Sequence, residues 1–397
     1  MGATGNTQRH MYSQVSHDAV DTRHQGSIVM PIYQSSLFAF ETHEAFDAAM
    51  KDVLHATVYS RGNNPTVAYL EQKIAALEGG ESARCFASGM AAISGTIFAL
   101  VKAGDHVVCV DQAYGPAREL LGDLEERYQV AVTYVDGTDT DAFAAAIRPN
   151  TKLFYLESPT SGLFELQDLR AVTALARSRG ILTAIDNSWA TPYFQRPLAM
   201  GCDLVLHSLT KYFSGHSDCL GGVVVGSERL VSLIARRSYM NLGAVMTPQT
   251  AALITRGLRT LPLRMERHQA SALKIAAHLA EKPDVVRVNH PGLPGYPQKE
   301  LAERQLSGTG GLFSFTTRHS VESMKRWADA LDFFRIGVSW GGYESLVSVS
   351  PAPEKHAENG KAPSLVRLFI GIEDPDELMA DIDRAWAKLP AADAAAQ

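Results

Sequence analysis

The sequence predicts an α/β fold in which a large domain with a mostly parallel central sheet precedes a smaller C-terminal α+β domain. Between about residues 80 and 230, short runs rich in β-branched residues alternate with helix-like stretches. Strands that alternate with helices in this way form parallel sheets that are covered on both faces. After about residue 245 longer helices replace the alternation, which indicates a second domain of a different class.

In the large domain, helices are expected at 114–128, 139–148 and 168–179. The expected strands are HVVCV, VAVTYV, KLFYLE, ILTAID, DLVLHS and GGVVVG. In the second domain, the order expected is long helices over 249–282, an isolated strand GLFSFTTR, a helix from 320, the strand VRLFIGIE and a last helix. The Pro-rich polar stretch 350–363 predicts a loop.

The first 60 residues lack the alternation, which is typical of an arm that packs on another surface. An adjacent subunit is the expected surface. The predicted organisation is therefore an arm over 1–60, a large domain over 61–245 and a C-terminal domain over 246–397.

Composition narrows the class of protein. The 397 residues carry 46% hydrophobic and 20% charged side chains, as globular chains do. With 37 Lys+Arg against 43 Asp+Glu, the net charge of −6 does not favour nucleic acid or an anionic membrane as a partner. The four cysteines form no C-x-x-C pair, so no disulfide framework and no metal site are expected. Without an apolar signal core or membrane span, a cytoplasmic location is expected.

Ligands of parallel sheets bind beyond the carboxyl ends of the strands, so residues at those ends are the candidates for chemistry. Ser88-Gly89-Met90 opens a helix-like stretch, and its backbone N–H groups suit an anion such as a phosphate, although an ordinary helix cap also fits. Asp186 closes the strand ILTAID and needs a partner, either an arginine or a protonated cofactor nitrogen.

Lys211 follows the strand DLVLHS, between hydroxyl donors such as Ser208 and Thr210. Partial burial there would lower its pKa and make it a nucleophile towards an aldehyde, whereas a solvated loop lysine is the simpler alternative. Tyr114 precedes a helix and either packs or stacks on a flat heterocycle. Arg367 lies in an apolar strand, where a substrate carboxylate competes with an internal salt bridge as its partner.

These features together are more specific than any one of them. A phosphate cradle, a stacking ring, an acid, a lysine and a carboxylate-binding arginine are the parts that a pyridoxal 5′-phosphate (PLP) enzyme acting on amino acids requires. The sequence therefore predicts PLP as the cofactor and a small amino acid as the substrate.

Over nearly its whole length the chain resembles the Cys/Met-metabolism family of PLP-dependent enzymes, which have the fold-type I, aspartate-aminotransferase-like architecture. The segments that carry the resemblance are VMPIYQSS, YSRGNNPT, ASGMAAI, YLESPTSGLFE, AIDNSWATP, HSLTKYFSGHSD, SWGGYESL and RLFIGIED.

The resemblance implies roles for individual residues. Lys211 would bond the cofactor aldehyde and act in catalysis together with Tyr114 and Tyr59. Asp186 would pair with the ring nitrogen, and Tyr114 would also stack on the ring. The phosphate would be held by Gly89, Met90, Ser208 and Thr210. Tyr59 and Arg61 would complete the site of an adjacent subunit, and the substrate would contact Tyr59, Ser339, Trp340 and Arg367. A homotetramer with shared sites is implied.

Within the family, Trp340, Ser161 and Pro116 resemble cystathionine β-lyases. The segment YSRGNNPT is closer to the γ branch. The first hypothesis is a carbon–sulfur β-lyase that cleaves L-cystathionine, or a related S-substituted cysteine, to a thiol, pyruvate and ammonia, in transsulfuration and methionine biosynthesis. The alternative is γ-elimination or γ-replacement, including a role in specialised metabolism.

A third hypothesis, of another class, is a non-catalytic relative that acts as a regulator. The intact set of Lys211, Asp186 and Arg367 argues against it.

Overall fold

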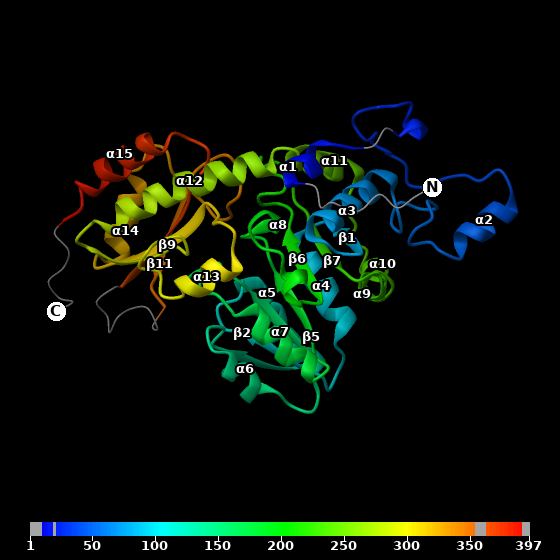
Figure 1. Ribbon diagram of the computed structural model, residues 1–397, viewed down its shortest axis with the longest axis horizontal. Coiled ribbons are helices and arrows are strands. Elements are labelled where there is room, and N and C mark those ends of the chain that lie inside the picture. The colour runs from blue at the N-terminus through cyan, green and yellow to red at the C-terminus, as the bar shows by residue number, and fades with distance from the viewer. Residues whose placement is uncertain (1–9, 19–20, 354–362, 391–397) are drawn as a thin grey trace.

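The computed structural model describes residues 10–18, 21–353 and 363–390, which fold around two sheets (Figure 1). The larger sheet has seven strands in the order β1-β7-β6-β5-β4-β2-β3. Its strands are β1 (Ser82–Phe86), β2 (His106–Val110), β3 (Ala131–Val135), β4 (Thr151–Glu157), β5 (Leu182–Asp186), β6 (Leu204–Ser208) and β7 (Gly222–Gly226). Strands β2 to β6 run parallel, and β7 pairs antiparallel with both β6 and β1. The predicted mostly parallel α/β class is confirmed.

Helices connect these strands and cover both faces of the sheet (Figure 1). The helices of the first 245 residues are α1 (Met11–Ser16), the 3₁₀ helix η1 (Thr22–His24), α2 (His43–Met50), α3 (Pro65–Glu78), α4 (Gly89–Leu100), α5 (Gly115–Tyr128), α6 (Thr140–Ala146), α7 (Leu169–Ser178), α8 (Thr191–Phe194), the 3₁₀ helix η2 (Pro197–Met200), α9 (Glu228–Ile234), the π-helical η3 (Ala235–Tyr239) and α10 (Met240–Leu242). Helices α5, α6 and α7 lie within two residues of their predicted bounds.

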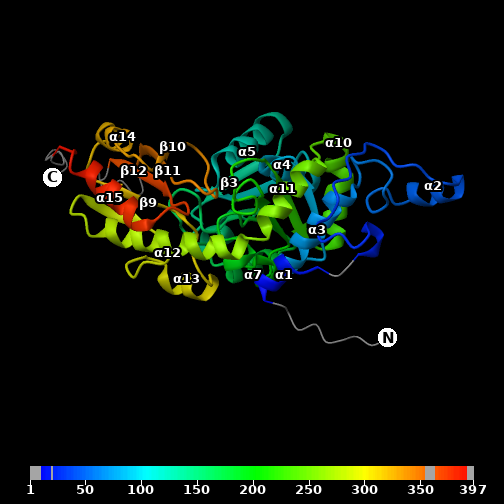
Figure 2. The ribbon, with the colours of Figure 1, turned by 90° about the horizontal axis from the view of Figure 1, so that it is seen from above.

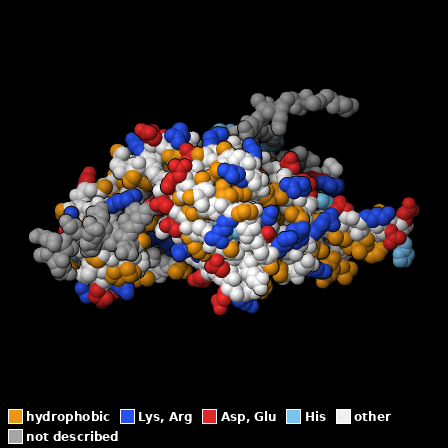
Figure 3. All heavy atoms as spheres, turned by 90° about the horizontal axis from the view of Figure 1, so that it is seen from below, with side chains coloured by type: hydrophobic (Ala, Val, Ile, Leu, Met, Phe, Trp, Pro, Cys, Tyr) orange, Lys and Arg blue, Asp and Glu red, His pale blue; other side chains and the backbone are white. Residues whose placement is uncertain are grey.

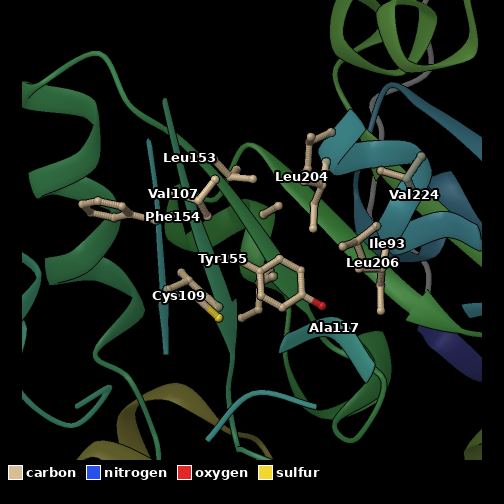
Figure 4. Packing of buried hydrophobic residues seen from close by; sticks show 14 of the residues in the cluster. Ile93, Val107, Cys109, Ala117, Leu153, Phe154, Tyr155, Leu204, Leu206 and Val224 are labelled. Carbon is tan, nitrogen blue, oxygen red and sulfur yellow. The ribbon is translucent and has the colours of Figure 1, made fainter. Parts of the chain in front are cut away.

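The core of the larger sheet explains why these segments form strands. Residues of β2, β4 and β6 such as Val107, Leu153 and Leu204 are fully buried, because helices pack on both faces. Ile93 of α4 and Ala117 of α5 pack into the same cluster (Figure 4). A strand covered on both faces needs a continuous apolar run, and this is the pattern that made β2 and β4 recognisable.

The second sheet has five strands in the order β10-β11-β12-β9-β8. They are β8 (Val285–Asn289), β9 (Leu312–Thr317), β10 (Arg335–Ile336), β11 (Leu346–Pro351) and β12 (Ser364–Phe369). The sequence predicted two strands here and called the first isolated, which is wrong because β9 pairs with both β8 and β12. The predicted loop 350–363 begins inside β11, and its residues 354–362 lie outside the described residues.

The helices of the second region pack along this sheet. They are α11 (Pro248–Leu258), α12 (Leu261–Ala280), α13 (Lys299–Gln305), α14 (Val321–Asp329) and α15 (Pro375–Trp386). Helix α12 runs from the larger sheet to the smaller one and so spans both halves of the molecule (Figure 1). The predicted helical stretch 249–282 is two helices, α11 and α12, which meet at Arg259 and Thr260.

The N-terminal segment has two parts that behave differently. Helix α1 packs against α3 and α12 of its own chain and buries Met11 and Val15. Helix α2 buries no residue and projects from the body in both ribbon views (Figures 1 and 2). The arm prediction therefore describes α2 better than α1, and the predicted domain boundaries stay predictions.

The face seen in Figure 3 carries acidic and basic side chains interspersed, without one sign gathered over any element. No helix in the described part of the chain is long and apolar enough to cross a bilayer.

Candidate active site

A cavity of about 640 Å³ opens where the strands β4, β5 and β6 end, beside the start of α4 and the connection from β10 to β11. This is the edge at which ligands of parallel sheets bind. Ten of the residues predicted for the site line it: Gly89, Met90, Tyr114, Asp186, Ser208, Thr210, Lys211, Ser339, Trp340 and Arg367.

The start of α4 forms one end of the cavity. Ser88 caps the helix, since its side chain accepts a hydrogen bond from the Ala91 N–H at 3.1 Å. A Cβ at Gly89 would lie 2.9 Å from the Cβ of Ser208, so only glycine lets the helix start approach the end of β6 this closely. The positive end of the helix dipole and the N–H groups of Gly89 and Met90 therefore lie beside the Ser208 hydroxyl. This arrangement suits a phosphate group.

Lys211 lies in the middle of the cavity. Burial, together with the positive charge of Arg367, lowers the pKa of Lys211 to about 8. Its Nζ donates a hydrogen bond to the Ser339 hydroxyl and lies 5.2 Å from the centre of the Trp340 ring. An amine with a lowered pKa is neutral in a larger fraction of molecules near neutral pH, which is the form that attacks an aldehyde.

Trp340 forms a rigid wall beside this lysine. Only 8% of its surface is exposed, and its ring packs against Tyr212 at 5.3 Å between centroids. The Tyr212 hydroxyl in turn accepts the Gly311 N–H at 2.6 Å, which fixes the ring from behind. Trp340 is therefore packed beside Lys211 against a ring that is itself hydrogen-bonded to the backbone.

Tyr114 and Asp186 line the cavity on the side of the larger sheet. Asp186 ends β5 and accepts the Ser188 N–H at 2.9 Å. Tyr114 caps α5, and its backbone N–H donates to Glu157 at 2.6 Å. Burial and the negative charge of Asp186 raise the pKa of the Tyr114 hydroxyl, so it stays protonated near neutral pH.

Arg367 enters the cavity from β12 of the second sheet. Burial lowers its pKa, while the charge of Glu157 opposes this shift. Among the described residues no hydrogen bond or ion pair of its guanidinium is found, so the internal salt bridge considered from the sequence is absent there. A half-buried guanidinium that faces a cavity, with no direct partner among the described residues, suits a carboxylate ligand.

Tyr59 and Arg61 do not line this cavity. Tyr59 is half exposed, and Arg61 donates to the Met240 carbonyl at 2.8 Å. Their predicted role in the site of an adjacent subunit stays a prediction.

Sequence reasoning missed part of the lining. Glu157 ends β4, and the strand-end rule that selected Asp186 could have found it. Ser161 was used only to judge the branch of the family, although it lines the cavity beside Glu157. Val338 and Leu220 form an apolar rim, and no pattern in the sequence marks them because each lies in an irregular loop.

The residues present fit PLP. An anion-binding helix start, an amine with a lowered pKa, an acid, an aromatic ring and an arginine without a direct partner lie around one cavity large enough for a cofactor and a small substrate. In the described ranges no three His, Cys, Asp or Glu side chains group as metal ligands.

Comparison with known proteins agrees with this fit. The family model described as Cys/Met metabolism PLP-dependent enzyme matches residues 13–387. An L-methionine gamma-lyase of Pseudomonas putida is 40% identical over 370 residues, which cover 91% of this chain and 93% of the relative. A cystathionine gamma-lyase of Dictyostelium discoideum is 36% identical over 376 residues, 92% of this chain and 94% of the relative.

A crystal structure of metB from Corynebacterium glutamicum superimposes with a TM-score of 0.88 at 35% identity, covering 96% of this chain and 98% of that one. With the family match over most of the chain, these likenesses confirm the predicted family, the fold type and the cofactor. The chain belongs to the Cys/Met-metabolism family of PLP-dependent enzymes.

Proposed function

We propose that this enzyme is a carbon–sulfur β-lyase that cleaves L-cystathionine, or a related S-substituted cysteine, to a thiol, pyruvate and ammonia. The observation that carries the proposal is the buried Trp340 ring, held 5.2 Å from Lys211 Nζ by its packing on Tyr212. The proposal includes a role in transsulfuration and methionine biosynthesis.

The bound cofactor supplies an aldehyde that bonds amines and a ring that withdraws electrons from the substrate's α-carbon. In the proposed reaction Arg367 and Ser339 bind the substrate carboxylate, which points the Cα–H bond towards Lys211. Lys211 Nζ, whose pKa is lowered to about 8, then accepts the α-proton. Asp186 would hold a proton at the cofactor's ring nitrogen, and the Tyr114 ring would stack on the cofactor and orient it.

Reaction specificity depends on what happens after the α-proton is removed. β-Elimination needs only a Cβ–S bond aligned with the ring. γ-Elimination needs a further proton removed from Cβ, so the base must move along the substrate. A fixed aromatic wall beside the amine limits that movement and favours the shorter route.

The second candidate is γ-elimination or γ-replacement. It is favoured by the names of the relatives, which include a methionine gamma-lyase and a cystathionine gamma-lyase. The apolar rim of Val338 and Leu220 suits a thioether with an apolar substituent, a group that both candidate reactions accept.

Products from L,L-cystathionine distinguish the two candidates. β-Elimination gives homocysteine, pyruvate and ammonia, whereas γ-elimination gives cysteine, 2-oxobutyrate and ammonia. S-methyl-L-cysteine and L-methionine, assayed in parallel by mass spectrometry, extend the test to shorter substituents. Dominant 2-oxobutyrate from cystathionine, or turnover of methionine but not of S-methylcysteine, would replace β-elimination by the second candidate.

Trp340→Leu tests whether the Trp340 ring determines which elimination takes place. Removing the wall should raise the ratio of 2-oxobutyrate to pyruvate about tenfold, a typical effect of reshaping one pocket contact. Trp386→Leu, which alters a tryptophan packed on α14 and β9 away from the cavity, is the matched control and should leave the ratio unchanged. An unchanged ratio in Trp340→Leu would remove the support that this wall gives to β-elimination.

The proposal also includes shared sites in a homotetramer, with Tyr59 and Arg61 reaching the cavity of an adjacent subunit. The exposed apolar side chains of the arm, such as Ile28 and Leu37, support a contact with a second copy. Co-refolding inactive Lys211→Ala and Arg61→Ala chains should regain activity through hybrids with one intact site. If no activity is regained, Arg61 acts in the active site of its own chain.

A further inference from the structure

The cavity contains a second carboxyl group that the proposed reaction does not use. Glu157 is the last residue of β4, and its register partner is Asp186, the last residue of β5. Only 5% of its surface is exposed. Burial, together with the negative charge of Asp186, raises the pKa of Glu157, whereas the hydrogen bonds from Tyr114 and Ser161 oppose this shift and favour the ionised carboxylate. A carboxyl buried beside another carboxyl is costly, so its contacts should explain why a glutamate stands there.

The two oxygens of Glu157 join two loops. Oε2 accepts the backbone N–H of Tyr114 at 2.6 Å, and Oε1 accepts the backbone N–H of Ser161 at 2.6 Å. The Ser161 side chain also hydrogen-bonds this carboxyl. Tyr114 belongs to the turn before α5 and Ser161 to the loop after β4, and both residues line the cavity. One side chain therefore sets the spacing of two loops that are separated by more than forty residues in the chain.

Arg367 is the third group that Glu157 influences. The negative charge of Glu157 favours the cationic form of this guanidinium, which burial disfavours. Glu157 thus acts on Tyr114 through a hydrogen bond to its backbone and on Arg367 through its charge. Tyr114 would contact the cofactor and Arg367 the substrate carboxylate.

We propose that Glu157 is a positioning residue for the elimination reaction, in which its carboxyl holds the Tyr114 turn and the Ser161 loop at the spacing that lets the Tyr114 ring contact the cofactor while Arg367 binds the substrate carboxylate. The expected changes in kcat and KM rest on the proposed function, whereas the expected change in circular dichroism does not. A carboxylate is required because it can accept a hydrogen bond on each oxygen, whereas an amide of the same shape accepts on one atom alone.

Glu157→Gln tests this requirement, with Asp381→Asn as the matched control. Asp381 is another buried carboxylate that accepts two backbone N–H groups, those of Asp332 and Phe333, both at 3.0 Å, but it lies on α15 away from the cavity. Glu157→Gln removes one of the two backbone bonds of Glu157. Asp381→Asn can keep both of its backbone bonds on one oxygen and loses the ion pair with Arg384, far from the cavity. The purified holoenzymes are compared in cofactor content, circular dichroism of the cofactor's visible band, kcat and KM for L,L-cystathionine, and thermal midpoint.

Glu157→Gln should keep its cofactor, because the phosphate-binding end and Lys211 are untouched. Its visible circular dichroism should change, and KM should rise about tenfold or more, as expected when a contact that aligns the substrate is lost. Glu157→Asp keeps two acceptor oxygens on a shorter side chain, so its KM should rise less, about threefold. Asp381→Asn should change the thermal midpoint alone.

The proposal is overturned if Glu157→Gln has the KM and the dichroism of the parent enzyme, or if both variants lose only thermal stability. If Glu157→Gln does not fold, parental KM and dichroism in Glu157→Asp overturn it equally. Failure of the proposed function is distinguishable, because the parent enzyme would then give mainly 2-oxobutyrate from cystathionine or would not turn it over. In that case the circular dichroism of the cofactor's visible band still tests whether Glu157 positions the site.

Discussion

The two walls of the cavity are built from different kinds of structure. On one wall Asp186 and Ser208 end neighbouring parallel strands, so the sheet ladder fixes their spacing. On the other wall Ser339 lies in an irregular connection with a positive φ of 81°, and the adjacent Val338 is 86% exposed. The first wall faces the proposed cofactor and the second the proposed substrate. Since irregular loops accept substitutions that a sheet does not, we expect reaction specificity to vary on the second wall while the cofactor chemistry is kept.

The largest effect is expected from Lys211→Ala, which removes the amine at the junction of the two walls. Without a group to bond the aldehyde and to accept the α-proton, turnover should fall by about 10³-fold or more. Borohydride reduction followed by peptide mass spectrometry should find the cofactor on Lys211 in the parent enzyme and on no lysine in the variant. Lys274→Ala, at a surface lysine paired with Asp376, is the control and should keep full activity. A reducible label on another lysine would refute the assignment.

Asp186→Ala tests the wall that the sheet provides. Loss of the charge opposite the ring nitrogen should slow exchange of the substrate α-proton about 10²-fold, the usual effect of removing one preorganised electrostatic contact. Cofactor retention after dialysis should also fall. Deuterium exchange at the α-carbon, followed by NMR, measures the step directly. An unchanged exchange rate would mean that Asp186 is structural only.

Gly341→Ala tests the irregular wall. Gly341 has a φ of +90°, and an added Cβ would lie 2.8 Å from Lys211 Cα. The variant should lower the free energy of unfolding by about 1 to 3 kcal/mol and raise KM, because the loop must shift away from the lysine. Gly295→Ala, at a glycine with open space around it, is the control and should change neither quantity. Parental stability and KM in Gly341→Ala would show that the loop adapts without cost.

The smallest effect concerns acid stability of the half of the molecule that carries the substrate wall. Burial lowers the pKa of both His268 and His290 from 6.5 to about 4. Because the folded chain holds them neutral while the unfolded chain takes up protons below pH 6.5, their contribution to stability is complete above pH 6.5, falls between pH 6.5 and 4 and is lost below about pH 4. Urea unfolding at a series of pH values should show this loss, of roughly 3 kcal/mol per histidine.

His290→Asn separates this effect from general acid denaturation. The Asn side chain offers an acceptor near the position where His290 Nδ1 accepts the Gly292 N–H, but it cannot titrate. The variant should therefore lose less stability than the parent between pH 6.5 and 4. A parental slope in His290→Asn would exclude His290 as the origin.

The sequence predicted the regular wall better than the irregular one, and the reason is physical. Asp186, Ser208 and Lys211 follow apolar runs whose period identifies them as strands, so the position of the side chains at the sheet edge follows from the fold class. Strand β1, with the sequence SARCF, was missed because Arg84 interrupts its apolar run. The guanidinium is buried there against Glu71, a partner from α3 that no local pattern indicates.

The positions of Ser339 and Trp340 came from resemblance to a family and not from pattern. Their connection has no period, and what holds it is contact with distant residues: Tyr212 packs on Trp340, and the backbone of Lys211 lies against Gly341. Tertiary contacts of this kind are not encoded in neighbouring residues. The hydrogen bonds by which Glu157 joins two loops were not predicted, for the same reason.

The strand order of the larger sheet determines when the phosphate-binding end can assemble during translation. Strand β1 lies at the edge of the sheet and pairs only with β7, so residues 82–86 leave the ribosome long before their partner, residues 222–226. Ser88 and Gly89 follow β1 directly, and the helix start they form is seated against Ser208 only once that pairing closes. At the usual rate of about 5 to 20 residues per second, the phosphate-binding end is assembled many seconds after its own residues are made. A nascent chain interrupted before β7 therefore lacks the assembled phosphate-binding end, and we expect firm retention of the cofactor only in chains that are more than half synthesised.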